Sequence, residues 1–152
     1  MDTMNSSPTV STLLEALSSE GVTAKVMKLQ SELLQRPQVQ VASVFAYGGG
    51  IAAKAVLLRA GTMAVGGMHR FENMNLVTKG DISVATESGV VRHTVTDAPI
   101  LIVSPPGTKR AAYVHADTYW VSLHPTDKST VEEVEAEFIV SDETAFLKLM
   151  GK

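Results

Sequence analysis

Between residues 38 and 140 the sequence alternates apolar and polar positions over short segments, and glycine or proline turns separate these segments. A period of two is typical of a strand with one buried and one solvated face. Turn signals stand at residues 48–50, 60–61, 79–80, 88–89 and 105–107. We therefore expect an all-β antiparallel barrel or sandwich. The expected strands are residues 38–45, 53–58, 63–66, 75–78, 81–86, 90–95, 100–104, 110–115, 118–124 and 136–140.

The two ends of the chain carry helical patterns instead. Thr12 and Glu15 form a capping box at the start of a first expected helix. A second helix is expected over residues 24–35, ended by Pro37, and Ser141 caps a last one. Short amphipathic helices are unstable alone, so the first two are expected to dock on the barrel or on another subunit. The expected organisation is an N-terminal helical arm (1–36), a barrel (37–140) and a C-terminal helix (141–152).

The composition excludes several classes of protein. The 152-residue chain has no cysteine, so it can form neither disulfides nor thiolate metal sites, which favours synthesis in a cytoplasm. Its 13 Lys and Arg against 16 Asp and Glu give no basic surface for nucleic acid. No secretory signal is visible at the N-terminus, and no apolar run approaches the length of a membrane span.

Two segments carry most of the specific information. The first runs from Gly61 to Gly80 and reads GTMAVGGMHRFENMNLVTKG, and the second is SPPGTKR at residues 104–110. They resemble the two motifs of the cupin superfamily, G-x5-H-x-H-x3-E-x6-G and P-x-G-x2-H, with every spacing intact. The amino-acid sequence around these two motifs is also similar to that of a small cupin-like family found in phages and prophages. The resemblance covers about residues 41–135 and implies a cupin-like antiparallel jelly-roll barrel, to which the helical patterns add a short N-terminal helical arm and a C-terminal helix.

The resemblance also shows that the family's metal site is degenerate here. The usual metal ligands fall on Gly67, His69, Asn73 and Arg110, so only His69 is retained. Gly67 offers no side chain, and the Asn73 amide is a neutral, weak ligand. We therefore expect no metal cofactor at these positions.

Arg110 changes the charge expected in the barrel. Its guanidinium is permanently cationic and cannot coordinate a metal ion. A retained pocket would suit an anion better than a divalent cation, with Lys109 beside Arg110 as a second basic group. Alternatively, Arg110 forms a structural ion pair with Glu72 or Asp117, which is the reading we favour because a buried arginine is usually paired.

The histidines at positions 69, 115 and 124 are the remaining candidates for a site. His69 is interpreted as a satisfied core residue, with a relic ligand or a general base as alternatives. Counting by two from Arg110 places His115 on the opposite face of its strand. If a relocated metal site exists, its ligands are expected to be His69, Glu72, His115 and His124.

Three functions follow as hypotheses. The first is a non-catalytic, phage-encoded structural or binding protein that forms homo-oligomers and joins or decorates a virion with other phage structural proteins, made in the host cytoplasm. The second is an isomerase or oxygenase that uses Mn, Fe, Ni or Zn on a small polar metabolite. The third is a metal-free binder of an anionic small molecule, held by Arg110, Lys109, His69 and Glu72. The residues favour these hypotheses in the order given.

Overall fold

The computed structural model of the chain describes residues 21–86 and 88–140. This part is mostly β-structure, and its two helices are α2 (Val22–Leu33) and α3 (Val131–Phe138). The strands are β1 (Ala42–Gly48), β2 (Ile51–Leu58), β3 (Met63–Val65), β4 (Met68–His69), β5 (Asn73–Thr86), β6 (Gly89–Thr94), β7 (Ile100–Ser104), β8 (Ala111–Pro125) and β9 (Ile139–Val140). Neither of these helices is long and apolar enough to cross a membrane. The expected helices at Thr12 and after Ser141 lie outside the described residues.

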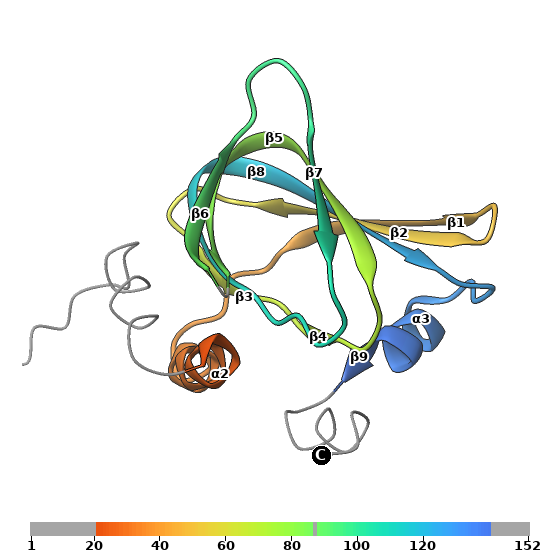
Figure 1. Ribbon diagram of the computed structural model, residues 1–152, viewed down its shortest axis with the longest axis horizontal. Coiled ribbons are helices and arrows are strands. Elements are labelled where there is room, and N and C mark those ends of the chain that lie inside the picture. Colours follow the sequence, from red (N-terminus) through yellow and green to blue (C-terminus); the bar gives the residue numbers. More distant parts are fainter. Residues whose placement is uncertain (1–20, 87, 141–152) are drawn as a thin grey trace, which may run out of the picture.

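The architecture is built on two long strands, β5 and β8, which pair with each other and curve together across the molecule (Figure 1). Seven strands form one hydrogen-bonded antiparallel sheet, which this curvature folds into two layers. We call the layer with the order β1-β2-β8-β5-β7 sheet one. It contains the second half of β8 and the first half of β5. The remaining halves join β3 and β6 in the layer that we call sheet two. This arrangement confirms the expected antiparallel jelly roll.

The bend between the layers lies where the sequence predicted a turn at residues 79–80 and a break between the expected strands 110–115 and 118–124. The register of β5 against β8 shifts between Val77 and Lys79 and again before Asp81 and Ile82. At the centre of this irregularity Gly80 has a φ of 120°. A Cβ atom there would lie 2.5 Å from the Cα of Thr118, so only glycine allows the two backbones to approach. The Lys79-Gly80 signal therefore marks a β-bulge, and residues 75–78 and 81–86 belong to one strand. Residues 110–115 and 118–124 likewise merge into β8.

Helix α2 covers part of the outward face of sheet two. Its buried residues Val22 and Val26 pack against Ala85 of β5 and Ala111 of β8, with Tyr113 partly buried beside them. The helix begins two residues before the expected range, and its apolar stripe docks on the barrel, which is one of the two expected destinations. Burial of two valines is worth about 3 kcal/mol or more, enough to hold a helix of this length in place.

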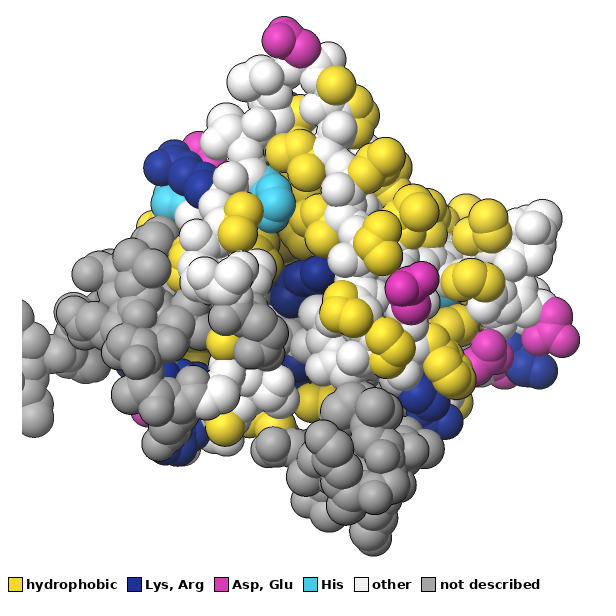
Figure 2. All heavy atoms as spheres, viewed as in Figure 1, with side chains coloured by type: hydrophobic (Ala, Val, Ile, Leu, Met, Phe, Trp, Pro, Cys, Tyr) yellow, Lys and Arg dark blue, Asp and Glu magenta, His cyan; other side chains and the backbone are white. Residues whose placement is uncertain are grey.

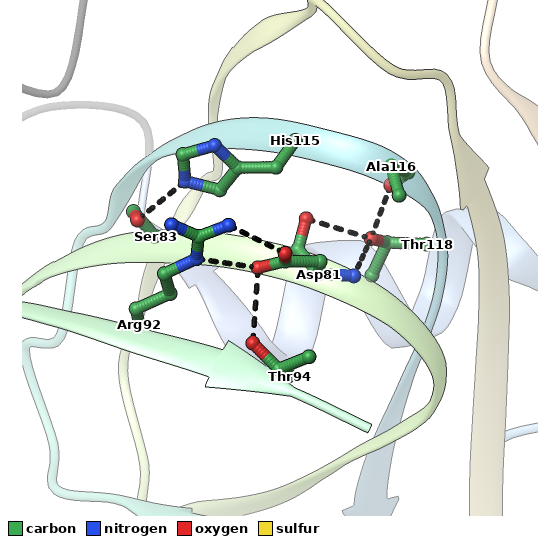
Figure 3. Close-up of polar contacts among 7 residues, drawn as sticks. All are labelled: Asp81, Ser83, Arg92, Thr94, His115, Ala116 and Thr118. Atoms are coloured by element: carbon green, nitrogen blue, oxygen red, sulfur yellow. Dashed lines mark hydrogen bonds and ion pairs between the residues drawn. The ribbon is translucent and has the colours of Figure 1, made fainter. Parts of the chain in front are cut away.

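The part of the same outward face that carries polar side chains is shown in Figure 3. The Arg92 guanidinium donates two hydrogen bonds to the Asp81 carboxylate, at 2.8 and 2.7 Å, and Thr94 donates a third at 3.2 Å. The hydrogen bond from Arg92 is the main cause of the lowered pKa of Asp81. Nearby, the Ser83 hydroxyl and the His115 imidazole lie 2.7 Å apart.

The end of the described chain differs from the sequence prediction. Residues 136–140 were expected to form a strand, but residues 131–138 form α3 and only Ile139 and Val140 are extended. The Thr130 hydroxyl accepts a hydrogen bond from the Glu133 amide at 3.3 Å, which caps the helix. Val134 and Phe138, one helical turn apart, are both buried. The prediction was wrong because alternation over five residues fits either a strand or the last turn of an amphipathic helix.

Candidate functional site

A cavity of about 360 Å³ lies between sheet one and sheet two. Its walls are largely apolar and come from both layers, with Phe45, Val56 and Trp120 on one side and Ile82 and Val84 on the other. In the view of Figure 2 a basic side chain is visible in the recess near the centre of the molecule. The polar and charged residues of the lining are Tyr47, Lys54, His69, Asn75, Thr108, Arg110, Ser122, His124 and Glu135.

Two of these residues, His69 and His124, form a pair inside the cavity. Strand β4 positions His69 by pairing with β9, and His124 lies near the end of β8. The Nδ1 atom of His69 lies 3.0 Å from the Nε2 atom of His124, and the rings stack with a centroid distance of 5.1 Å. The His124 ring also contacts Phe138 of α3 at 4.4 Å. A hydrogen bond at this distance requires one nitrogen to donate and the other to accept, so at least one imidazole is neutral.

Both histidines are held in the neutral form. The pKa of His69 is lowered from 6.5 to about 4, mainly by burial and in addition by the neighbouring His124 and Arg110. Burial also lowers the pKa of His124, and the charge of Lys54 acts in the same direction. At neutral pH the pair therefore adds hydrogen-bonding groups but no charge to the cavity.

Arg110 is the strongest fixed charge of the cavity. Its guanidinium lies 5.9 Å from the centre of the Trp120 ring, a cation–π contact, and burial lowers its pKa. The structural ion pair that we favoured is wrong. Asp117 pairs instead with Arg59 at 2.7 Å, and Arg110 has no carboxylate within salt-bridge distance in residues 21–86 and 88–140. A half-buried cation without a carboxylate partner is a group that an anionic ligand would stabilise.

Asn75 organises a group of polar side chains on the sheet-one wall of the cavity. Its side-chain nitrogen donates to Asn73 at 2.9 Å and to Ser104 at 2.8 Å, and its oxygen accepts from Trp120 at 3.1 Å and Ser122 at 2.8 Å. Only 2% of Asn75 is exposed, so all four of its hydrogen-bonding positions are used inside the protein. The residue therefore fixes the orientation of the Trp120 ring below Arg110, and it has no free lone pair for a metal ion.

The other residues singled out in the sequence lie outside this cavity. The ammonium group of Lys109 is turned to the Gly66 carbonyl, to which it donates at 3.0 Å, and Lys109 is 9% exposed. Glu72 is exposed and does not line the cavity. His115 faces away from Arg110, as its strand position predicted, and contacts Ser83 and Tyr113. Of the four possible metal ligands, the structure thus brings together only His69 and His124.

Sequence reasoning gave no role to Asn75 or Ser122, although both line the cavity. A signal for them was present: Trp120, Ser122 and His124 alternate along one strand and so share one face. Recognising that face as the interior required the register of β8 against β5, which pairs Ser122 with Asn75.

The residues present do not fit the metal centre of the motif. Gly67 and His69 line the cavity, but Asn73 is hydrogen-bonded to Asn75 and Phe71, and Arg110 brings a positive charge. Within the described ranges, no three His, Asp or Glu side chains lie close enough together to hold a metal ion. Two imidazoles and a guanidinium are not a ligand set for a divalent cation.

Comparison with known proteins defines the fold only. No protein-family model and no curated protein sequence matches the chain. Among solved structures, ectoine synthase from P. lautus is similar over 70% of this chain and 81% of its own, with 14% identity and a TM-score of 0.51.

Two further structures match less closely. A cupin superfamily protein from Desulfitobacterium hafniense covers 64% of this chain and 87% of its own at 12% identity and a TM-score of 0.47. KdgF from Halomonas sp. covers 57% and 82% at 20% identity and a TM-score of 0.46. Together with the antiparallel jelly roll and the glycine-bounded motif at residues 61–80, the likeness to ectoine synthase identifies the architecture: the chain has the cupin fold.

Proposed function

We propose that this protein is a non-catalytic binding protein that takes a small organic anion with an apolar body into the cavity between its two sheets. The observation that carries the proposal is the Arg110 guanidinium, which lines the cavity and has no carboxylate partner in the described part of the chain. An arginine cannot relieve this situation by losing its proton, so a bound carboxylate or phosphate is the natural counter-charge.

The charge balance of the lining supports an anion. Lys54 adds a second cation, and Glu135 is the one acidic residue among the described lining residues. The Lys54–Glu135 pair is loose, at 3.7 Å, and its side chains are 43% and 53% exposed. A pair this exposed is strongly screened by water and does not neutralise Arg110 deeper in the cavity. The local potential therefore favours negatively charged ligands.

The remaining lining indicates what the rest of the ligand would look like. The walls formed by Phe45, Val56 and Trp120 favour an apolar or aromatic body over a highly hydroxylated one. The Tyr47 hydroxyl is buried and has no hydrogen-bond partner among residues 21–86 and 88–140, so a ligand or a water molecule could satisfy it. We therefore expect an aromatic or branched aliphatic carboxylate to bind better than inorganic phosphate.

A binding experiment on the full chain tests the proposal. A panel of aromatic and aliphatic monocarboxylates, dicarboxylates and inorganic phosphate would be screened by thermal shift and measured by calorimetry. We expect at least one carboxylate to raise the melting temperature and to bind about 10- to 100-fold more weakly to the Arg110→Met variant, because one charge-assisted contact is lost.

The matched control is Arg59→Met, which removes an arginine on the outside of the barrel, where Arg59 pairs with Asp117. This variant is expected to bind the carboxylate as the wild type does. If no member of the panel stabilises the protein at millimolar concentration, or if Arg110→Met binds with unchanged affinity, the proposal is wrong.

The metal-dependent alternative is tested in the same preparation. A cupin enzyme acting on a polar metabolite would need a third donor beside His69 and His124. Elemental analysis for Mn, Fe, Ni and Zn, with and without dialysis against each ion, separates the two ideas. Stoichiometric metal that is lost in His69→Gln would favour the enzyme and count against the anion binder.

A second candidate function is that of a phage structural protein that joins or decorates a virion. It is favoured by a separate observation: the exposed side chains of Val44, Leu101 and Val103 give the outward face of sheet one an apolar surface. Mass spectrometry of purified phage particles from the source host would test this role. Absence of the protein from intact particles would contradict it while leaving the anion binder untouched.

A further inference from the structure

The outward face of sheet one is apolar across all five of its strands. Strand pairing places ten of its outward residues in two complete rows, and these ten are alanine, valine, leucine or methionine. The rows are Val44–Ala55–Val121–Leu76–Leu101 and Ala46–Ala53–Leu123–Met74–Val103. A third row beside them, Ala42–Leu57–Tyr119–Lys79, ends on a charged residue.

Several of these side chains are strongly exposed. Val44 is 70% exposed, Leu101 66% and Val103 60%. An antiparallel sheet that faces water on one side normally places polar residues there. Figure 2 shows hydrophobic side chains gathered over the side of the molecule on which Figure 1 places β7, β5 and the β1–β2 hairpin. A contiguous apolar surface of this extent marks an interface.

The outward face of sheet two shows how this molecule treats apolar residues elsewhere. There, Ala85, Ala111 and Tyr113 are apolar and lie under α2. Where α2 no longer covers the sheet, the outward residues become Asp81, Arg92 and their hydrogen-bonding partners (Figure 3). On sheet two, the apolar outward residues therefore lie where α2 covers them. Neither described helix packs on the two rows of sheet one, so their cover must come from elsewhere.

We propose that a second copy of this chain covers the face, in a two-fold symmetric dimer. The two complete rows hold no charged side chain, so two copies meet without like-charge repulsion and without the charge pattern that selects a different partner. A symmetric contact uses one surface twice and so requires self-complementarity.

The distribution of side-chain sizes provides that complementarity. The outward residues of β1 and β2 in the two complete rows are alanines apart from Val44, whereas those of β5 and β7 are leucine, methionine and valine. A two-fold axis running along β8, which lies in the middle of the layer, places the small half of one copy opposite the large half of the other. The two layers would then pack with their strands nearly aligned, as in β-sandwiches.

The available area fits a reversible dimer. Five strands about 4.8 Å apart, each with about six paired residues, present a projected area of about 500 Å² per copy. Two copies would bury about 1,000 Å², which is near the lower limit for a specific protein interface. We therefore expect a dimer that dissociates on dilution, and the inference does not depend on the ligand of the cavity.

Sedimentation equilibrium of the full chain over a range of protein concentrations tests the dimer. The wild type is expected to be a concentration-dependent dimer. Leu101→Lys places a charge in the contact of each copy and should raise the dissociation constant at least about 100-fold. The matched control is Leu34→Lys, because Leu34 is 65% exposed but follows α2, away from sheet one. Circular dichroism and thermal melting confirm that each variant is folded.

The double variant Val44→Lys/Leu101→Glu tests the position of the axis. With the axis along β8, Val44 of each copy lies opposite Leu101 of its partner, so the two substitutions form ion pairs and restore dimerisation. Dimers of the double variant support the proposal, and so does loss of the dimer in Leu101→Lys alone. A wild type that stays monomeric at all concentrations, a Leu101→Lys dimer of unchanged affinity, or a double variant that stays monomeric overturns it.

Discussion

The two outward faces of the barrel differ in what lies on them, although similar residues build both. On sheet two, Val22 and Val26 of α2 bury Ala85 and Ala111, and an ion pair between Asp81 and Arg92 occupies the rest. On sheet one, an unbroken apolar surface has no described segment on it. The difference teaches that one face is completed within the chain and that the other is completed by association.

The comparison also distinguishes residues that stabilise the folded monomer from residues that act on dimer formation. Substitutions beneath α2 should weaken the folded monomer, because they remove contacts that exist in a single copy. Substitutions on sheet one should leave the monomer intact and act on the dimer. The following predictions test this separation in order of decreasing effect.

The largest effect is expected at the bend that creates the two faces. Gly80→Ala introduces a Cβ 2.5 Å from the Cα of Thr118 at a φ of 120°, so the strand cannot keep its path. We expect the free energy of unfolding to fall by about 4 kcal/mol or more, measured by urea denaturation. The control is Gly50→Ala, in the β1–β2 turn, where an added Cβ meets nothing within 4 Å. Its positive φ should cost only about 1 kcal/mol. Equal losses for the two variants would show that the bend is not fixed by this close approach.

Gly80 also illustrates how far the sequence could be read. The motif and the period-two segments predicted an antiparallel jelly roll, and the strand over residues 100–104 matched β7 in both bounds. A lysine–glycine pair between two apolar segments, however, fits either a hairpin turn or a bulge in one strand. Only the close approach to Thr118 distinguishes them, and that contact spans residues far apart in the chain. The local sequence around residues 79–80 therefore cannot reveal the contact with Thr118.

The sequence predicted some residues of the site, Arg110 and His69, but not the contacts between them and their neighbours. The loss of metal ligands at Gly67, Asn73 and Arg110 could be predicted, because it depends only on which residues stand at these positions. The partner of Arg110 could not be predicted, because it depends on distances between side chains in the folded chain. The ion pair with Asp117 was wrong because Arg59 pairs with that carboxylate. The hydrogen bonds of Asn75 were likewise invisible, since its partners come from β7 and β8.

The second prediction concerns the pH dependence of the free energy of unfolding, which we expect to arise from His69 in the interior between the two sheets. Folding keeps His69 neutral by lowering its pKa from 6.5 to about 4, so the unfolded chain binds more protons between these values. Stability is therefore complete above pH 6.5 and falls as the pH drops toward 4, by up to about 3 kcal/mol. Denaturation in dilute solution across this range measures the slope, which His69→Gln should reduce.

In contrast to the free energy of unfolding, the dissociation constant of the dimer is not expected to depend on pH. The two rows on sheet one contain no group that titrates between pH 4 and 6.5, so the dissociation constant of the folded protein should stay nearly constant. A dissociation constant that followed the His69 titration would show that the interior and the outer face are coupled.

The third prediction compares the faces directly. Val26 is 3% exposed under α2, so Val26→Ala should reduce the free energy of unfolding by about 2 kcal/mol. Leu101 is 66% exposed, so Leu101→Ala removes a larger side chain but should change the stability of the monomer by no more than about 0.5 kcal/mol. Both are measured well below the dimer dissociation constant. Comparable losses would mean that sheet one is already covered within a single chain.

The smallest effect is expected from salt. The two complete rows of sheet one carry no charge, so screening has nothing to weaken there, and dimer affinity should change by less than about two-fold between 0.05 and 0.5 M NaCl. The exposed Asp81–Arg92 pair on sheet two, in contrast, is subject to screening, and it provides a charged reference surface on the same molecule. Sedimentation at several salt concentrations measures the dependence. A steep loss of affinity with salt would assign the association to charged side chains outside the rows, and the apolar face would then still lack its cover.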